Sequence, residues 1–253
     1  MSPTEILPWH TAWITGASSG IGRELAVRLA HAGCEVAVSA RSADRLAALA
    51  AEHPRIIPVA YDVRDTVAAD GAFANVVERF GVPELVVLNA GIGVFKSASR
   101  FDAALFRTAF ETNVIGMGNA LAAVVPAFVT RGSGHIALMG SLAGYRGFPR
   151  AVHYAPTKAA IRSMADCLRF DLEGKGITVT VINPGYIETP LTAANDAPMP
   201  GLMPLAPAVD RIVKGLAAKR YEIAFPWHMA LAVKLGAKVS NRAYFAFTRL
   251  ISG

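Results

Sequence analysis

Hydrophobic and polar positions along the chain fall into two patterns that alternate. Short apolar runs rich in β-branched residues occur at 12–17, 35–41, 56–63, 84–91, 134–141, 177–185 and 221–226. The longer segments between them repeat apolar residues at helical spacing, at 21–33, 42–53, 67–80, 102–112, 113–130 and 155–176. Strands that are apolar on both faces and alternate with helices are typical of a parallel sheet covered on two sides. The pattern therefore predicts a single-domain, doubly wound α/β fold with a parallel, seven-stranded sheet.

Two segments depart from this alternation. Residues 186–207 are rich in Pro, Ala, Met and Leu and follow the sixth strand, where the ligand-side loops of such sheets emerge. We expect them to form a mobile apolar lid, which suggests an apolar or bulky substrate. Residues 227–253 continue beyond the last strand as a basic amphipathic extension of helices, so the main domain is expected to cover residues 1–226.

The composition, with 53% hydrophobic and 17% charged residues, is that of a compact fold and excludes a disordered chain. We expect no secretory signal and no segment that is apolar over the length needed to cross a bilayer. The two cysteines, Cys34 and Cys167, form no metal-binding or disulfide pattern. A cytoplasmic protein without a metal site is therefore expected.

The net charge of +6 is concentrated near the C-terminus. From residue 211 onward there are eight Lys or Arg and one acid, whereas the first 210 residues hold 17 basic and 18 acidic residues. A nucleic-acid surface should be basic where the fold itself binds, so nucleic acid is not an expected partner. For the extension two interpretations remain: a helix on an anionic membrane surface, or helices packed over the cleft or at a dimer interface. We favour the packed form.

A glycine-rich turn, "ITGASSGIG", joins the first strand to the first helix. Glycine permits a tight turn and close approach of the backbone to a ligand, and the helix N-terminus behind it attracts a pyrophosphate. Such patterns are common, but this one lies between a strand and a helix in the first βα unit, which predicts dinucleotide binding rather than a structural turn. The residues of the turn expected to bind the cofactor are Gly16, Ser18, Ser19, Gly20 and Ile21.

The second strand ends in Ser-Ala-Arg, without the acidic residue that usually selects a plain ribose. Arg41 stands there instead, and a guanidinium can pair with a 2′-phosphate through two hydrogen bonds. We therefore expect NADP(H) as the preferred cofactor. NAD(H) is the alternative if Arg41 is only a solvated loop charge.

Polar residues suited to proton transfer follow the later strands. Tyr154 and Lys158 lie four residues apart at the start of a helix, and hence on one face of it. Ser141 ends the fifth strand, and Asn113 lies in the helical segment after the fourth. With the glycine turn, "LNAG" at 88–91 and "NPGYIET" at 183–189, these residues resemble the short-chain dehydrogenase/reductase family from about residue 11 to about residue 226. The resemblance implies a Rossmann-like fold and an NADP(H)-dependent oxidoreductase that interconverts a carbonyl and a secondary alcohol, here on an apolar or lipid-like substrate.

The same resemblance implies a role for each polar residue. Tyr154 would exchange a proton with the substrate oxygen. Lys158, together with the positively charged nicotinamide, would lower the pKa of the phenol from about 10 towards working pH. Lys158 would also bind the nicotinamide ribose, and Ser141 would donate to the substrate oxygen. Asn113 would hold a water that links Lys158 to solvent.

Further cofactor contacts are implied at the strand ends. Asp62 and Val63 would flank the adenine, Asn89, Ala90 and Gly91 would meet the adenosine ribose and nearby backbone, and Pro184, Gly185, Ile187 and Thr189 would meet the nicotinamide end.

Four residues of these motifs either have a second interpretation or depart from the usual pattern of the family. Ser141 has a second interpretation as a strand-end cap, and Asn89 as the stabiliser of a turn. Leu88 stands where the family usually has asparagine, which puts a local hydrogen bond in question. Pro156 lies between the tyrosine and the lysine, in a first helical turn that needs no donor.

The presence of the tyrosine, the lysine and the serine favours an enzyme over a non-catalytic NADP(H) sensor on the same fold. The expected partners are a small-molecule carbonyl or alcohol and a second copy of the chain. We favour a homodimer over a tetramer, because the extension would block the C-terminal contact that tetramers of the family use.

Overall fold

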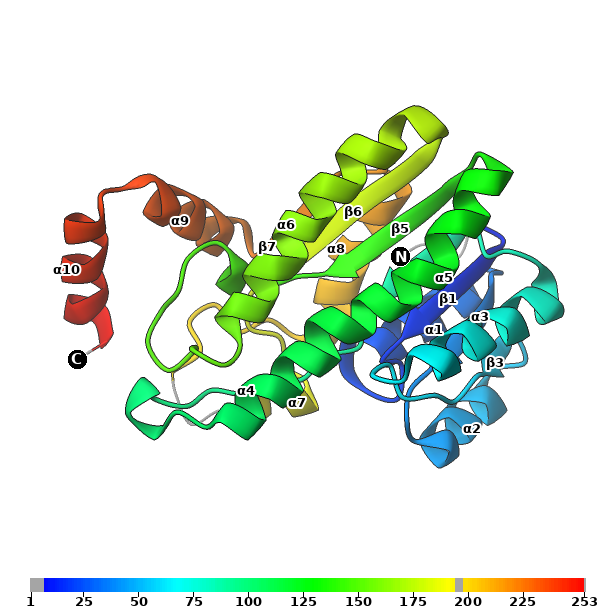
Figure 1. Ribbon diagram of the computed structural model, residues 1–253, viewed down its shortest axis with the longest axis horizontal. Coiled ribbons are helices and arrows are strands. Elements are labelled where there is room, and N and C mark those ends of the chain that lie inside the picture. The colour runs from blue at the N-terminus through cyan, green and yellow to red at the C-terminus, as the bar shows by residue number, and fades with distance from the viewer. Residues whose placement is uncertain (1–6, 194–197, 253) are drawn as a thin grey trace.

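The computed structural model describes residues 7–193 and 198–252, and its helices cover both faces of one parallel sheet (Figure 1). The seven strands lie in the order β3-β2-β1-β4-β5-β6-β7. They span β1 Thr11–Thr15, β2 Glu35–Ser39, β3 Ile56–Pro58, β4 Leu85–Leu88, β5 Gly134–Met139, β6 Ile177–Pro184 and β7 Glu222–Phe225. The predicted doubly wound, seven-stranded sheet is confirmed.

Helices of the two layers enclose separate hydrophobic cores. They span α1 Gly20–His31, α2 Ala43–Glu52, α3 Thr66–Phe80, α4 Ala103–Phe110, α5 Gly116–Arg131, α6 Ala155–Leu172, α7 Pro190–Ala193, α8 Leu205–Ala217, α9 Trp227–Lys238 and α10 Asn241–Ser252, with short 3₁₀ turns η1 Ala98–Arg100, η3 Leu142–Gly144 and η4 Glu173–Lys175. On one face, Leu29 of α1 and Ile212 of α8 are buried in the same cluster. On the other face, Phe73, Phe128 and Ile161 bring α3, α5 and α6 together.

The order of the strands reverses between β1 and β4, which are neighbours in the sheet but distant in the sequence. In doubly wound sheets a crevice opens at the carboxyl ends of the strands on either side of such a reversal. Here the glycine turn leaves β1 and the Asn89–Gly91 segment leaves β4 at this point. The topology therefore brings two of the predicted cofactor segments to one place.

The segments predicted as helices 102–112 and 113–130 form one continuous helix from Ala103 to Arg131. A π-helical turn, η2 Glu111–Ile115, joins α4 to α5 without a break. The joined helix has 29 residues and is, by length and composition, apolar enough to cross a membrane. The expectation that no segment meets this criterion is therefore wrong. However, Val124 and Phe128 are fully buried against the sheet, as in a core helix.

The predicted lid, 186–207, begins as a loop that returns on itself. Ile187 pairs with Met203 in an isolated bridge, and α7 lies between them in the sequence. Residues 194–197 of the lid lie outside the described residues. The last part of the lid enters α8 at Leu205.

The extension forms two helices, α9 and α10, which leave the end of β7 and turn away from the sheet (Figure 1). The α9 helix contacts β7 and η3, and its Ala230 is buried. Arg146, in the loop after β5, fastens the corner between the two helices. Its guanidinium donates to the carbonyls of Gly236 and Val239 at 2.7 and 3.0 Å, and lies 3.8 Å from the centre of the Tyr244 ring.

Candidate active site

The glycine turn is held too tightly for any larger residue at two positions. Gly16 has a φ of +68°, and a Cβ there would lie 2.6 Å from the Cα of Ala90. A Cβ on Gly22 would lie 2.5 Å from Nδ2 of Asn89. The turn thus packs directly on the end of β4, and α1 begins behind it at Gly20 with no acid in its first turn. An anion at this helix N-terminus would meet unpaired backbone N–H groups.

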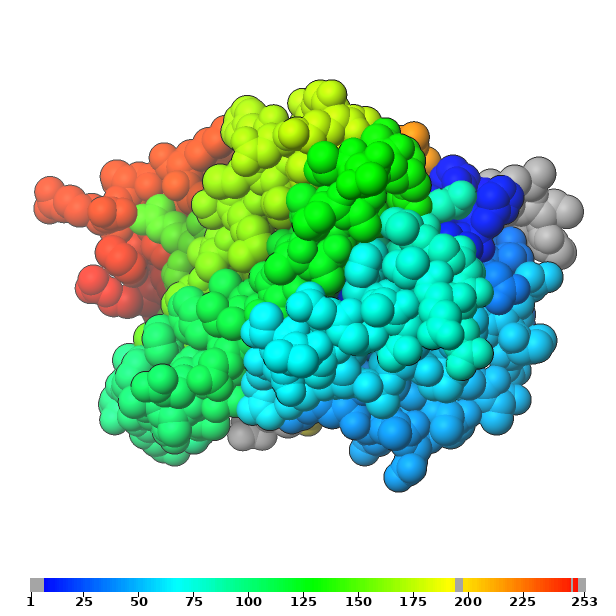
Figure 2. Space-filling view, turned by 45° about the vertical axis from the view of Figure 1, so that its right-hand side comes forward, coloured from blue at the N-terminus to red at the C-terminus, as the bar shows by residue number. Residues whose placement is uncertain are grey.

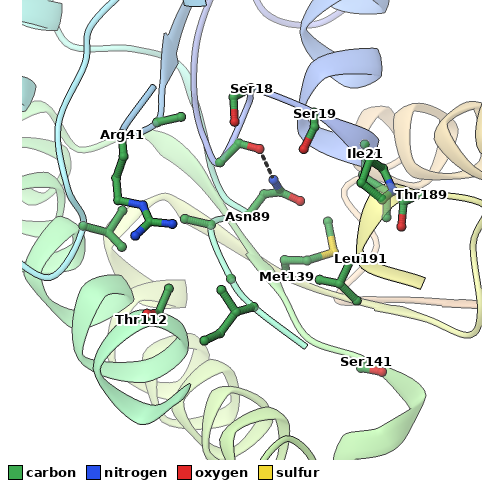
Figure 3. Close-up of a pocket in the computed structure, with 18 of the residues that line it drawn as sticks. Ser18, Ser19, Ile21, Arg41, Asn89, Thr112, Met139, Ser141, Thr189 and Leu191 are labelled. Atoms are coloured by element: carbon green, nitrogen blue, oxygen red, sulfur yellow. Dashed lines mark hydrogen bonds between the residues drawn. The ribbon is translucent and has the colours of Figure 1, made fainter. Parts of the chain in front are cut away.

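The side chain of Asn89 supports this turn. Its Nδ2 donates to the carbonyls of Thr15 and Gly16 at 3.0 and 3.1 Å, and the second bond is the dashed line in Figure 3. The backbone N–H groups of Asn89 and Ala90 donate to Oγ1 of Thr15. The Nδ2 group of Asn89 therefore stabilises the turn, as in the alternative interpretation of this residue. Asn89 also lines the cavity, so its contact with a ribose stays a prediction. Leu88, before it, is buried in the core, so an apolar residue suits that position.

One cavity of about 680 Å³ connects the two predicted halves of the site. Figure 3 shows Arg41 and Ser141 at opposite ends of it. All the residues predicted to bind the cofactor line it, namely Gly16, Ser18, Ser19, Gly20, Ile21, Arg41, Asp62, Val63, Asn89, Ala90, Gly91, Tyr154, Lys158, Pro184, Gly185, Ile187 and Thr189. Ser141 lines it too, whereas Asn113 is fully buried beside it.

The end of the cavity near Arg41 holds two further arginines besides the one predicted from the sequence. Arg45, in the first turn of α2, and Arg64, just after the adenine-side Asp62, also line it. Arg64 donates to both carboxylate oxygens of Asp62, at 3.1 and 2.6 Å. These hydrogen bonds from Arg64, and to a smaller extent the charge of Arg41, hold the pKa of Asp62 below its usual range. Arg45 follows Arg41 by four residues, and this second arginine after β2 is the signal in the sequence that points to it.

Tyr154 and Lys158 meet at the other end, as their spacing predicts. Tyr154 is the N-cap residue of α6 and is buried, with the ring of Phe95 5.0 Å from its own. Lys158 is buried as well, and its Nζ donates to the carbonyl of Met139 at 2.8 Å. Pro156 occupies the first turn of α6, where it costs no hydrogen bond, in agreement with the sequence analysis.

Burial dominates the acidity of this pair in the protein alone. It raises the pKa of Tyr154 to about 12, against a smaller lowering by the hydrogen bond with Ser141. It lowers the pKa of Lys158 to about 8. The Nζ of Lys158 lies 5.6 Å from the centre of the Tyr154 ring, but desolvation outweighs any effect of this charge on the phenol. The expected lowering of the pKa of Tyr154 is therefore not a property of the protein alone.

Ser141 lies where the chain turns out of β5. Its Oγ accepts from the N–H of Ala143 at 3.1 Å, so the residue does cap the η3 turn. Its own N–H donates to Oδ1 of Asn183 at 3.1 Å. Capping does not remove the hydroxyl from the cavity that Tyr154 also lines. The two interpretations of Ser141 are thus compatible.

Asn113 lies in the π-helical turn, and both the Nδ2 and the Oδ1 of its side chain bind other parts of the protein. Nδ2 donates to the carbonyl of Ile92 and to Oγ1 of Thr157, both at 3.0 Å. Oδ1 accepts from the N–H of Ile92 at 2.7 Å. Thr157 in turn donates to the carbonyl of Tyr154 at 2.7 Å. Both N–H groups of Asn113 therefore fix the site's framework. Its Oδ1 accepts only one bond and has a second lone pair, so the water expected beside this residue stays a prediction.

Sequence comparison relates the chain to one group of proteins. The profile of the short chain dehydrogenases matches residues 10–199. An uncharacterised oxidoreductase of Myxococcus xanthus is 36% identical over 247 residues, which cover 96% of this chain and 98% of that one. A sulfoacetaldehyde reductase of Chromohalobacter salexigens is 37% identical over 185 residues, 71% of this chain and 73% of that one.

Solved structures agree with the sequence comparison. A short-chain dehydrogenase from Streptomyces avermitilis matches with a TM-score of 0.81 at 26% identity, over 96% of this chain and 98% of that one. An alcohol dehydrogenase from Thermococcus sibiricus, complexed with 5-hydroxy-NADP, matches with a TM-score of 0.77 at 26% identity, over 85% and 95% of the two chains.

Proposed function

The chain belongs to the short-chain dehydrogenase family and is an oxidoreductase acting on CH–OH groups, and we propose that it uses NADP(H) and that Tyr154 transfers the proton. The observation that carries this proposal is the single cavity that extends from three guanidinium groups to Ser141, Tyr154 and Lys158. When bound, the nicotinamide supplies or accepts the hydride. The residues of the chain bind and orient the cofactor and the substrate, and they exchange the proton with the substrate oxygen.

The site fits a dinucleotide on two independent grounds. The turn at Gly16 and Gly20 has positive φ angles and brings the backbone and the N-terminus of α1 to the cavity, as a pyrophosphate requires. The cavity volume, about 680 Å³, lies within the range of roughly 300–1,000 Å³ found for small-molecule sites.

The preference for NADP(H) rests on charge. Arg41, Arg45 and Arg64 line one end of the cavity, where only Asp62 offers an opposing carboxylate among the lining residues. A doubly charged phosphate is favoured at such a site, and a guanidinium binds it through paired hydrogen bonds. The relative from Thermococcus sibiricus, whose structure holds an NADP derivative, supports this assignment.

The proton chemistry follows from the burial of the pair. With a pKa of about 12, Tyr154 keeps its proton on Oη near neutral pH, and it can give that proton to the oxygen of a reduced carbonyl. Ser141 Oγ, in the same cavity, would stabilise the charge that develops on that oxygen. Lys158, when protonated, and the positive charge of the oxidised nicotinamide both favour the phenolate that would form.

The reaction is tested by following NADPH absorbance with purified protein and a panel of carbonyl compounds. The panel should include apolar ketones, steroids and 3-oxoacyl thioesters for the lipid-like class, and sulfoacetaldehyde for the class of one relative. Tyr154→Phe should lower kcat by a factor of 10² or more, an order of magnitude typical of general acid–base catalysis, with little change in the Kd for NADPH. Tyr221→Phe, outside the cavity lining, is the matched control.

Residual activity of Tyr154→Phe within about tenfold of wild type, ~1.4 kcal/mol in the barrier, would remove Tyr154 from the proton step. Tight binding of NADPH without turnover of any carbonyl would favour the non-catalytic sensor instead. For the cofactor, Arg41→Ala should raise the Kd for NADPH much more than that for NADH. A wild-type protein that prefers NADH would contradict the NADP(H) assignment.

A further inference from the structure

The outer face of the C-terminal extension exposes large apolar side chains. Trp227, Leu231 and Leu235 of α9 are 69%, 50% and 55% exposed, and Phe245 of α10 is 52% exposed. The three residues of α9 are spaced by four, so they form one stripe along the helix. Globular surfaces rarely place aligned apolar residues of this size in water without a partner.

Basic residues accompany this stripe. At 3.6 residues per turn, Lys238 of α9 falls on the face that carries Leu231, and Arg242 and Arg249 flank Phe245 on one face of α10. Among the described residues, these three basic side chains form no salt bridge, whereas Lys234 pairs with Glu222. Residues 227–253 contain no Asp or Glu at all. The surface is therefore both apolar and uniformly positive.

The inner face of the extension is fixed to the rest of the molecule. Lys234 binds Glu222 of β7, Arg146 binds the corner between α9 and α10, and Tyr244 donates to the carbonyl of Gly147 at 2.8 Å. Figure 2 shows the extension as a projection at one end of the molecule. Among the described residues, none of the extension lines the cavity, and Phe245 lies 6.0 Å from the Arg146 guanidinium with half of its side chain exposed. These contacts are made with the main domain of the same chain, and packing over the cleft or at a dimer interface stays a prediction.

We propose that the exposed apolar and basic side chains of the extension dock on the surface of an anionic lipid membrane. They are Trp227, Leu231, Leu235, Lys238, Arg242, Phe245 and Arg249. Apolar and aromatic side chains at helical spacing insert among the headgroups, while the adjacent cations bind the acidic lipids. A second copy is the less suitable occupant. A two-fold contact would bring the same surfaces together, and thus place cations opposite cations with no carboxylate from either extension.

The proposal is tested by sedimentation of the full-length protein with vesicles of phosphatidylcholine, with and without phosphatidylglycerol. We expect binding only to the anionic vesicles, and less of it as salt is raised. The double variant Leu231→Glu/Leu235→Glu should bind at least tenfold more weakly. Its matched control is Val67→Glu/Phe170→Glu, which places the same charges at apolar residues that are 81% and 85% exposed elsewhere on the molecule.

A second variant tests the electrostatic part. Lys238→Gln/Arg242→Gln/Arg249→Gln removes three cations, each worth about fivefold in affinity near an anionic surface, so binding should weaken roughly 100-fold. Equal binding by this variant, or equal binding of the wild type to neutral vesicles, would overturn the proposal.

The remaining outcomes also decide the question. No binding of the wild-type protein to anionic vesicles excludes membrane docking. If Leu231→Glu/Leu235→Glu instead lowers the oligomeric state in analytical ultracentrifugation while vesicle binding is absent, the face is an interface between copies. Because all of these variants lie outside the cavity, none depends on the proposed reaction.

Discussion

Replacing Asn113 by alanine separates the structural role of this residue from the catalytic role that its family position implies. The change removes the two bonds that Nδ2 makes with Ile92 and Thr157, and the bond that Oδ1 accepts from Ile92. The N–H and the carbonyl of Ile92 lose their side-chain partner together. Thr157 keeps its own bond to the carbonyl of Tyr154.

The expected loss in the free energy of unfolding follows from the number of polar groups that Asn113→Ala leaves without a partner. A buried polar group without a partner costs about 1–3 kcal/mol, so the two main-chain groups of Ile92 represent about 2–6 kcal/mol. Ile92 is only partly buried, and water entering the cavity will compensate some of this cost. We expect Asn113→Ala to lower the free energy of unfolding by about 2–4 kcal/mol.

Urea denaturation followed by circular dichroism measures this loss, with kcat measured on the same preparations. Asn119→Ala is the matched control, because its amide lies on the same long helix and makes fewer bonds. Its Nδ2 donates to the carbonyl of Val63 at 2.9 Å, and its Oδ1 accepts from the exposed Oγ1 of Thr66 at 3.2 Å. This control should cost only about 1 kcal/mol and leave turnover intact. If Asn113→Ala changes the free energy of unfolding by less than about 0.5 kcal/mol while turnover is lost, the structural account is refuted.

Two further predictions concern the glycine turn and a buried histidine. Gly16→Ala places a Cβ 2.6 Å from Ala90 at a φ of +68°, so it should lower the free energy of unfolding by at least ~2 kcal/mol and weaken NADPH binding more than tenfold. The control is Gly33→Ala, with a φ of +99° but nothing within 4 Å, which should leave the Kd for NADPH unchanged when both variants are titrated by fluorescence. Equal Kd values for Gly16→Ala and Gly33→Ala would contradict the role of the turn. Burial lowers the pKa of His135 from 6.5 to about 4, so below pH 6.5 the unfolded chain binds a proton that the native chain does not. The free energy of unfolding should therefore fall by about 2 kcal/mol between pH 7 and pH 5, and His135→Gln, compared by urea denaturation at the two pH values, should remove most of this dependence.

The local parts of the site could be predicted from the sequence because their geometry is set within a few residues. The glycine turn needs only a strand before it and a helix after it. Tyr154 and Lys158 need only one turn of helix. Arg41 was found because the end of β2 lies next to the end of β1 in any sheet of this topology.

The other features of the site depend on contacts between segments that are distant in the sequence, and no local pattern predicts such contacts. The partners of Asn113 come from the loop after β4 and from α6, 21 and 44 residues away. The π-helical turn that carries it has no sequence period of its own, so the joined helix was predicted as two. Arg64 follows a strand whose apolar run extended five residues beyond the observed end of β3, at Pro58, and its place in the cavity was hidden by that boundary.

The same distinction between local spacing and distant contacts explains the pKa values of Tyr154 and Lys158. Spacing alone suggests that a cation four residues away makes the phenol more acidic, but the folded chain withdraws both groups from water. The resulting rise in the pKa of Tyr154, from 10.0 to about 12, corresponds to roughly 3 kcal/mol against the phenolate. Lys158 is meanwhile anchored to the carbonyl of Met139, and its own pKa falls to about 8. A phenol that keeps its proton is the state that a carbonyl reduction needs at its start under the proposed mechanism. Under the same mechanism, oxidation of an alcohol needs the phenolate first, and the charge that would favour it is that of the oxidised nicotinamide, which the protein alone does not supply.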